Sequence, residues 1–90
     1  MRRAAKVDRN HVEIVEALRA VGCYVVSLAS LGGGVPDLLV FKRSSGLLRL
    51  LEVKAPKGKL TPAQEEVFPR LPVWVVRSRD EALRAMEVAA

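Results

Sequence analysis

Three charged residues stand at the ends of two neighbouring apolar segments. Asp37 follows Pro36 at the start of one segment, and Glu52 and Lys54 lie at the end of the next. Carboxylate oxygens are hard ligands that suit Mg²⁺ or Mn²⁺, and Mg²⁺ typically takes one or two protein carboxylates beside waters and substrate phosphate. Two acids and a lysine in one place therefore predict a metal site for phosphodiester hydrolysis.

A hairpin would bring the two acids together. Residues 38–41 and 47–53 form two mainly apolar runs, and the segment between them, Arg43-Ser44-Ser45-Gly46, is typical of a short hairpin loop. If the loop is symmetric, paired residues have numbers that sum to 89, so Asp37 faces Glu52. Two like charges about 5 Å apart destabilise a sheet, and a divalent cation would offset that repulsion. Lys54 lies two residues after Glu52 and so shares its face.

Length and charge limit the classes of protein that fit. Ninety residues predict a single domain with a modest core, which an oligomer would help to stabilise. The net charge of +5 and the four aromatic residues favour nucleic acid as the partner, recognised by its backbone rather than by base stacking. No apolar run approaches the roughly 18 residues that span a bilayer, and no signal peptide is evident. We expect a soluble cytoplasmic protein without a membrane partner.

The rest of the chain predicts one α/β domain with the element order αβββαβα. Residues 1–7 read as a basic N-terminal arm and residues 8–90 as the domain. Thr61-Pro62-Ala63-Gln64 is a strong helix start, with Thr61 at the N-cap and Gln64 at the capping-box position. Strands that are apolar on both faces predict a mixed sheet flanked by helices. The other expected elements are a helix from Asp8 or Asn10 to about Val21, a strand over Cys23–Ala29, a strand over Pro72–Arg77 and a final helix from Ser78 to Glu87 or beyond.

Further candidates surround the acids and the lysine. Glu13 borders the apolar stripe of the first helix, where it could look toward the sheet or be one more surface glutamate. Lys57 and Lys59, in a loop beside the site, would raise affinity for DNA, or be merely solvated. Gly32 to Gly34, which precede Asp37, form either a mobile loop near the substrate, in which Gly33 and Gly34 would contact DNA, or a plain turn.

These residues resemble the PD-(D/E)xK nuclease superfamily and, within it, the stand-alone VRR-NUC (virus-type replication-repair nuclease) domains. The resemblance implies a restriction-endonuclease-like core and a Mg²⁺-dependent phosphodiesterase in which Mn²⁺ substitutes. It implies that Asp37, Glu52 and the carbonyl of Val53 hold the metal, and that Lys54 orients or activates the water. The motifs that carry it are Glu13 on a helix, Gly34-Val35-Pro36-Asp37, Glu52-Val53-Lys54 and Gln64 in Leu60-Thr61-Pro62-Ala63-Gln64.

The same resemblance implies roles for two more residues and for partners. Glu13 would hold a second metal or a water, and Gln64 would have a role in the site besides its helix cap. Stand-alone VRR-NUC domains are similar to Holliday junction resolvases, which implies a homodimer that cuts branched DNA in repair or recombination. A phage-encoded protein acting in a bacterial host fits this reading. Two alternatives stay open: a non-catalytic DNA-binding module on the same fold, and a small partner-binding protein.

Overall fold

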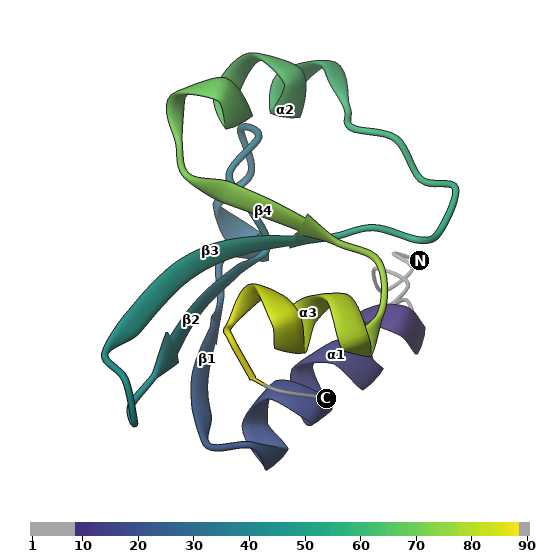
Figure 1. Ribbon diagram of the computed structural model, residues 1–90. Coiled ribbons are helices and arrows are strands. Elements are labelled where there is room, and N and C mark those ends of the chain that lie inside the picture. Colours follow the sequence, from purple (N-terminus) through teal and green to yellow (C-terminus); the bar gives the residue numbers. More distant parts are fainter. Residues whose placement is uncertain (1–8, 89–90) are drawn as a thin grey trace.

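The protein folds around a mixed four-stranded sheet, as the computed structural model shows (Figure 1). The structure describes residues 9–88. The strands lie in the order β1-β2-β3-β4, with β1, β2 and β3 antiparallel and β3 and β4 parallel. Their bounds are β1 Cys23–Ser27, β2 Leu38–Lys42, β3 Leu47–Val53 and β4 Val73–Val76. The expected basic arm and Asp8 lie outside the described residues. The order of elements is the predicted αβββαβα.

The hairpin of β2 and β3 has the predicted register. Leu38 pairs with Leu51 and Phe41 with Leu48, so the numbers of paired residues sum to 89. Gly46 closes the loop with φ +77°, a left-handed conformation that a residue without a Cβ adopts at little cost. The register places Asp37 and Glu52 at the same end of the hairpin.

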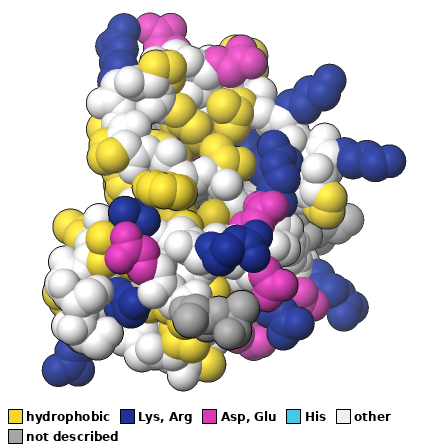
Figure 2. Space-filling view, viewed as in Figure 1, with side chains coloured by type: hydrophobic (Ala, Val, Ile, Leu, Met, Phe, Trp, Pro, Cys, Tyr) yellow, Lys and Arg dark blue, Asp and Glu magenta, His cyan; other side chains and the backbone are white. Residues whose placement is uncertain are grey.

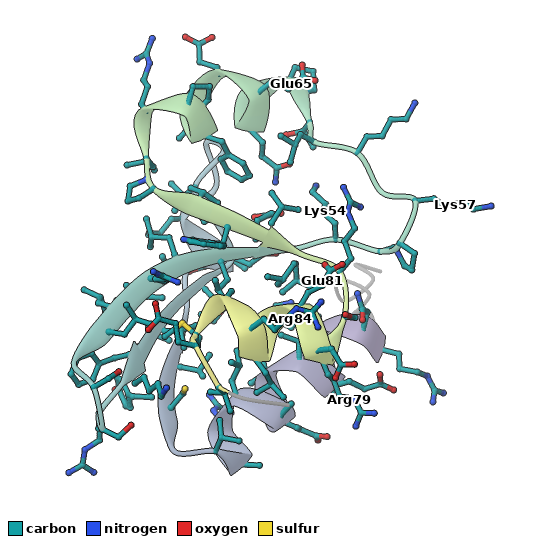
Figure 3. All side chains as sticks on the ribbon, viewed as in Figure 1. Lys54, Lys57, Glu65, Arg79, Glu81 and Arg84 are labelled. Carbon is teal, nitrogen blue, oxygen red and sulfur yellow. The ribbon has the colours of Figure 1, made fainter. Side chains whose placement is uncertain are left out.

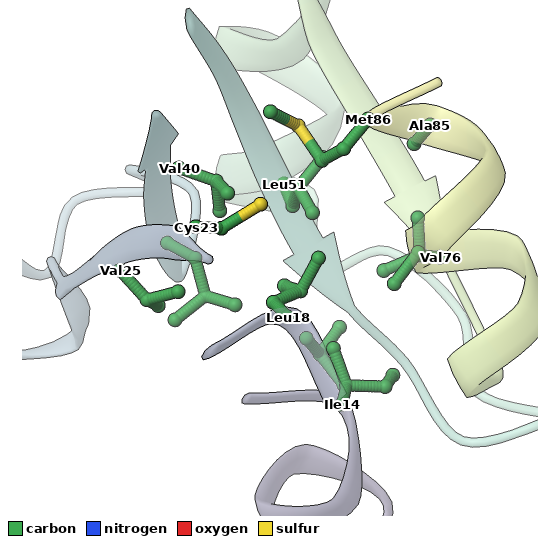
Figure 4. Packing of buried hydrophobic residues seen from close by; sticks show 12 residues of the cluster. Ile14, Leu18, Cys23, Val25, Val40, Leu51, Val76, Ala85 and Met86 are labelled. Carbon is green, nitrogen blue, oxygen red and sulfur yellow. The ribbon is translucent and has the colours of Figure 1, made fainter. Parts of the chain in front are cut away.

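One face of the sheet is covered by α1 (Arg9–Ala20) and α3 (Arg79–Ala85), which lie side by side below it in Figure 1. The apolar stripe of α1 points into this layer, where Ile14 and Leu18 are fully buried. Burial of each large aliphatic side chain contributes about 1.5–3 kcal/mol. Figure 4 shows how these side chains meet those of the strands and α3. The core consists of Ile14, Leu18, Cys23, Val25, Leu38, Val40, Leu51, Val53, Val76, Ala82, Ala85 and Met86.

The opposite face carries α2 (Pro62–Val67), the helix above the sheet in Figure 1. It begins with the predicted capping box: Thr61 Oγ1 accepts a hydrogen bond from the Gln64 N–H at 3.2 Å, and Gln64 Oε1 accepts one from the Thr61 N–H at 2.9 Å. A 3₁₀ turn, Phe68–Arg70, follows and buries Phe68. This crossover returns the chain to β4, parallel to β3.

The helices leave part of this second face uncovered. Tyr24, Phe41 and Leu48 form a row across three strands, because Phe41 pairs with both of the others. Their exposed fractions are 66%, 36% and 57%. The predicted mixed sheet flanked by helices is confirmed, and α2 leaves this row on its face exposed. Among the described helices, none has the length and apolarity to cross a bilayer.

Several elements end before their predicted limits. The first helix stops at Ala20, and Asn10 lies inside it rather than at its cap. The first strand stops at Ser27 and gives way to a 3₁₀ turn, Ala29–Leu31.

The final helix ends at Ala85 rather than at Glu87. Glu87 adopts φ +59°, which takes the chain out of the helix. Arg49 Nη1 donates to the Ala85 carbonyl at 2.5 Å, and Lys42 Nζ donates to the Glu87 carbonyl at 2.8 Å. Two cations from the hairpin thus satisfy the helix end, where positive charge is favoured by the helix dipole.

Candidate active site

Asp37 is fixed on three sides at the start of β2. Its carbonyl accepts a hydrogen bond from the Leu28 N–H at 2.7 Å, which extends the pairing of β1 with β2 by one step. Its own N–H donates to Glu52 Oε1 at 3.1 Å, and its Oδ2 accepts from the Val53 N–H at 3.1 Å. The half-buried carboxylate therefore has a defined direction, set by the hairpin register.

Glu52 is the only charged residue among the buried side chains of the described chain, with an exposed fraction of 3%. Burial raises the pKa of its carboxyl, and the nearby charge of Asp37 raises it further. The charge of Lys54 and the hydrogen bonds from Asp37 and Gln64 oppose that rise in pKa without cancelling it. A buried acid beside a second acid is costly for the fold, which is typical of a functional site.

Lys54 supplies the positive charge of the site. Its Nζ lies 3.6 Å from Glu52 Oε2, and 14% of its side chain is exposed. Its N–H donates to the Val76 carbonyl at 3.0 Å, so the β3–β4 pairing continues through it. Figure 3 shows Lys54 between the sheet and the loop that leads to α2. The structure therefore brings Asp37, Glu52 and Lys54 together as the sequence predicts.

Gln64 belongs to both the helix cap and the site. While its Oε1 accepts from Thr61, its Nε2 donates to Glu52 Oε2 at 2.9 Å. The two ends of one amide thus join the first turn of α2 to the buried carboxylate. A structural role and a site role coexist in this residue.

The acid pair fits a hard divalent cation. A carboxylate has about four lone-pair positions, and the hydrogen bonds described above use two on Glu52 and one on Asp37. Oxygen acceptors remain on both residues. Burial, and after it the charge of Asp37, raises the pKa of the Glu52 carboxyl, and a cation between the two acids would offset their repulsion. The donor set suits Mg²⁺ with waters completing its coordination.

Glu13 is not brought to this pair. It is exposed and lines a hollow with Glu16, Ala17 and Arg79, near the start of α3. Within residues 9–88, no three His, Cys, Asp or Glu side chains gather closely enough to hold a metal. Of the two readings left open for Glu13, its exposure fits the surface glutamate: a residue at the border of an apolar stripe can face either way, and this side chain is exposed.

The predicted DNA-contact residues occupy two loops. Lys57 and Lys59 are exposed in the segment between β3 and α2, and Lys57 points away from the domain in Figure 3. Gly33 is exposed. Gly34 packs against α2, because a Cβ on it would lie 2.7 Å from the Ala63 carbonyl oxygen.

Asn10 and Arg77, which the sequence did not single out for the site, hold backbone segments next to it. Asn10 Nδ2 donates to the carbonyls of Lys54 at 2.9 Å and Arg77 at 3.1 Å, which joins α1 to the ends of β3 and β4. Arg77 reaches the carbonyls of the lysine-bearing loop. The sequence predicts a helix cap at Asn10 and a strand end at Arg77. Their spacing in the sequence gives no indication of these long-range hydrogen bonds.

Comparison with known proteins gives one family. The family model of the VRR-NUC domain matches residues 4–80. A solved structure described as a VRR_NUC domain is similar to this chain, with 29% sequence identity and a TM-score of 0.66, and the match covers 88% of this chain and 91% of that one. A search of curated proteins returned no match.

Proposed function

Since the chain belongs to the VRR-NUC domain family, whose members have a nuclease-type fold, we propose that it is a metal-dependent DNA endonuclease. The observation that carries the proposal is the joining of Asp37 and Glu52. The backbone N–H of Asp37 holds the Glu52 carboxylate, the Asp37 carboxylate holds the next residue of β3, and Lys54 lies beside them.

The two carboxylates would hold Mg²⁺, with Mn²⁺ as a substitute and the Val53 carbonyl as a further ligand. The metal, when bound, supplies a Lewis acid that neutralises charge on the phosphorane oxygens and activates a water. Hydrogen bonds from the backbone and from Gln64 hold the Glu52 carboxylate in one direction, so little reorganisation is needed during the reaction.

Lys54 would act on the reacting groups directly. Its ammonium lies next to the Glu52 carboxylate and is mostly shielded from solvent, where a charge acts more strongly than in bulk water. There it can orient the attacking water and stabilise negative charge that develops on the phosphate. We assign Glu13 no part in this mechanism, because it lines a hollow with Glu16, Ala17 and Arg79 rather than with the acid pair.

The substrate we propose is branched DNA of the Holliday junction type. The net charge of +5 supports a nucleic-acid partner, and Figure 2 shows basic side chains projecting from the edge of the molecule to the right of the sheet. Lys57 and Lys59 would contact phosphates that flank the scissile bond, with the Gly33 and Gly34 turn at the other side of the acid pair. We further propose a homodimer, so that two sites cut two strands.

Cleavage by the purified protein tests the function. We expect nicking of a labelled four-way junction with Mg²⁺ or Mn²⁺ and none with chelator. Asp37→Asn and Lys54→Ala should each lower the rate by about 10²-fold or more, while DNA binding persists. Glu66→Gln, which changes an exposed acid paired with Arg70, is the matched control and should cut like wild type.

Other outcomes separate the alternatives. Cleavage by Asp37→Asn at the wild-type rate would show that the assigned site is wrong. Binding without cleavage in any metal would indicate a DNA-binding module, and neither binding nor cleavage would indicate a partner-binding protein. A panel of junctions, flaps, duplexes and single strands then identifies the preferred DNA.

A further inference from the structure

The loop between β3 and α2 is closed by a single guanidinium group. Its turn is formed by the Gly58 N–H, which donates to the Ala55 carbonyl at 2.9 Å. From the end of β4, Arg77 Nη1 donates to the carbonyls of Ala55 and Gly58, both at 2.8 Å, and lies 3.5 Å from that of Pro56. One nitrogen thus joins both ends of the turn that carries Lys57.

The main chain of Arg77 is held independently of its side chain. Its N–H donates to Glu81 Oε1 at 2.6 Å, and its carbonyl accepts from Asn10 Nδ2 at 3.1 Å. The same Asn10 amide holds the Lys54 carbonyl. The guanidinium therefore extends from a point that is fixed relative to the active-site lysine. Replacing the side chain would remove the loop contacts and leave these backbone contacts in place.

The 55–58 turn is tightly packed. A Cβ placed on Gly58 would lie 3.3 Å from both the nitrogen and the oxygen of Ala55, closer than most Cβ contacts. Lys57 lies at the outer bend of this turn with its side chain directed into solvent (Figure 3), and Lys59 follows directly after it. The positions of both ammonium groups thus depend on how the turn is closed.

We propose that Arg77 is a positioning residue for DNA: it fixes the 55–58 turn so that Lys57 and Lys59 meet the phosphates beside the Asp37–Glu52 pair. The inference rests on the proposed function, and Arg77 acts on DNA indirectly, through Lys57 and Lys59. Because its Nη1 hydrogens are directed to carbonyls, this nitrogen acts on the protein rather than on the substrate. A loop that is already ordered loses less conformational freedom on binding, which favours affinity.

A double-mutant cycle on DNA binding tests this role. Binding of a fluorescent four-way junction is measured by anisotropy in chelator, over a series of salt concentrations, so that no cleavage occurs. Each phosphate contact contributes about 0.9 to the slope of log K against log salt, so Lys57→Ala with Lys59→Ala should lower the slope by about two. Arg77→Met should lower it by about one to two, and Arg70→Met, which removes an exposed arginine, by well under one.

The decisive comparison is made in the protein that lacks both lysines. There Arg77→Met and Arg70→Met should have equal effects, because the turn no longer carries the groups that Arg77 positions. In cleavage assays with Mg²⁺, Arg77→Met should raise KM and leave kcat within about twofold of wild type. Thermal unfolding of each variant shows whether the fold is kept.

Several results would overturn the inference. They are an effect of Arg77→Met that persists in full without the lysines, a wild-type slope in Arg77→Met, a loss of kcat without a change in KM, or no DNA binding by the wild type. If cleavage fails while the binding cycle succeeds, the proposed catalysis is wrong and the positioning role stands. The reverse result leaves the nuclease and removes the role of Arg77.

Discussion

Ionisation of the buried Glu52 carboxyl should have opposite effects on the stability of the metal-free protein and of the protein with the proposed metal bound. Its pKa is raised by burial first and by Asp37 second. The uncharged acid is therefore favoured in the fold, and this contribution to stability is lost as pH rises from the ordinary glutamate pKa through the raised one. A metal binds only the charged form, so its contribution to stability appears over the same range.

Thermal unfolding with and without Mg²⁺ across this range should show the difference. We expect stabilisation by Mg²⁺ to be absent at low pH and to grow as Glu52 ionises, reaching about 2.7 kcal/mol at a hundred times the Kd. Asp37→Asn should abolish the Mg²⁺ effect and stabilise the metal-free protein near neutral pH by up to about 1 kcal/mol, because it removes a like charge. A pH-independent Mg²⁺ effect, or one that survives Asp37→Asn, would contradict this assignment.

The contacts at the residue scale were only partly predictable. The hairpin register follows from loop length and apolar pattern, so Asp37, Glu52 and Lys54 were placed correctly from the sequence. Local rules also identified Gln64 as a cap residue. Asn10 contacts a residue 44 positions away in the sequence, and Arg77 contacts one 22 positions away. No local sequence pattern indicates such contacts.

At the scale of elements, the position of α2 depends on how closely the helix packs against Gly34. Gly34 has φ +84°, and a Cβ there would lie 2.7 Å from the Ala63 oxygen and 3.1 Å from Val67 Cγ2. Any larger residue thus meets both backbone strain and a clash with α2. The docking of the helix that carries Gln64 rests on this contact.

Gly34→Ala should destabilise the protein by about 2–4 kcal/mol, from strain and overpacking together, and should reduce cleavage. Gly33→Ala is the matched control: Gly33 also has positive φ, at +67°, but a Cβ there meets nothing within 4 Å. It should cost only the strain, about 1–2 kcal/mol. Urea unfolding measures both variants. Equal losses of stability would show that contact with α2 is unimportant.

Element boundaries were less predictable than element types. The order αβββαβα and the start of α2 follow from apolar runs and capping residues. The end of α3 does not, because Glu87 leaves the helix with positive φ where no glycine signals it, and the Lys42 and Arg49 side chains that hold this end come from the hairpin. The exposed row of Tyr24, Phe41 and Leu48 was also not predicted, since apolar residues on two faces do not show how far a short helix extends.

At the scale of the whole molecule, the exposed row formed by Tyr24, Phe41 and Leu48 is the surface we assign to the proposed homodimer. Exposed apolar patches on small domains commonly mark interfaces. A self-complementary patch places the same residues on both copies in a symmetric dimer. Phe41 lies four residues along the chain from Asp37, so pairing through this row should leave both sites open.

Sedimentation velocity at micromolar concentration tests the dimer. We expect wild type to sediment as a dimer and Leu48→Glu as a monomer, because burying an unpaired charge in an interface is costly. Val12→Glu, at an exposed apolar position on α1, should remain dimeric. If wild type is a monomer with and without DNA, paired incision by two copies is ruled out.

The side-chain amide of Gln64 links the proposed metal site to the formation of a helix. A helix of six residues is marginal alone, and the first turn of α2 depends on a side chain that also holds Glu52. Whatever orders the carboxylate therefore also orders the helix, and by linkage the reverse holds. We therefore expect hydrogen exchange at the first amides of α2 to slow when Mg²⁺ fills the proposed site.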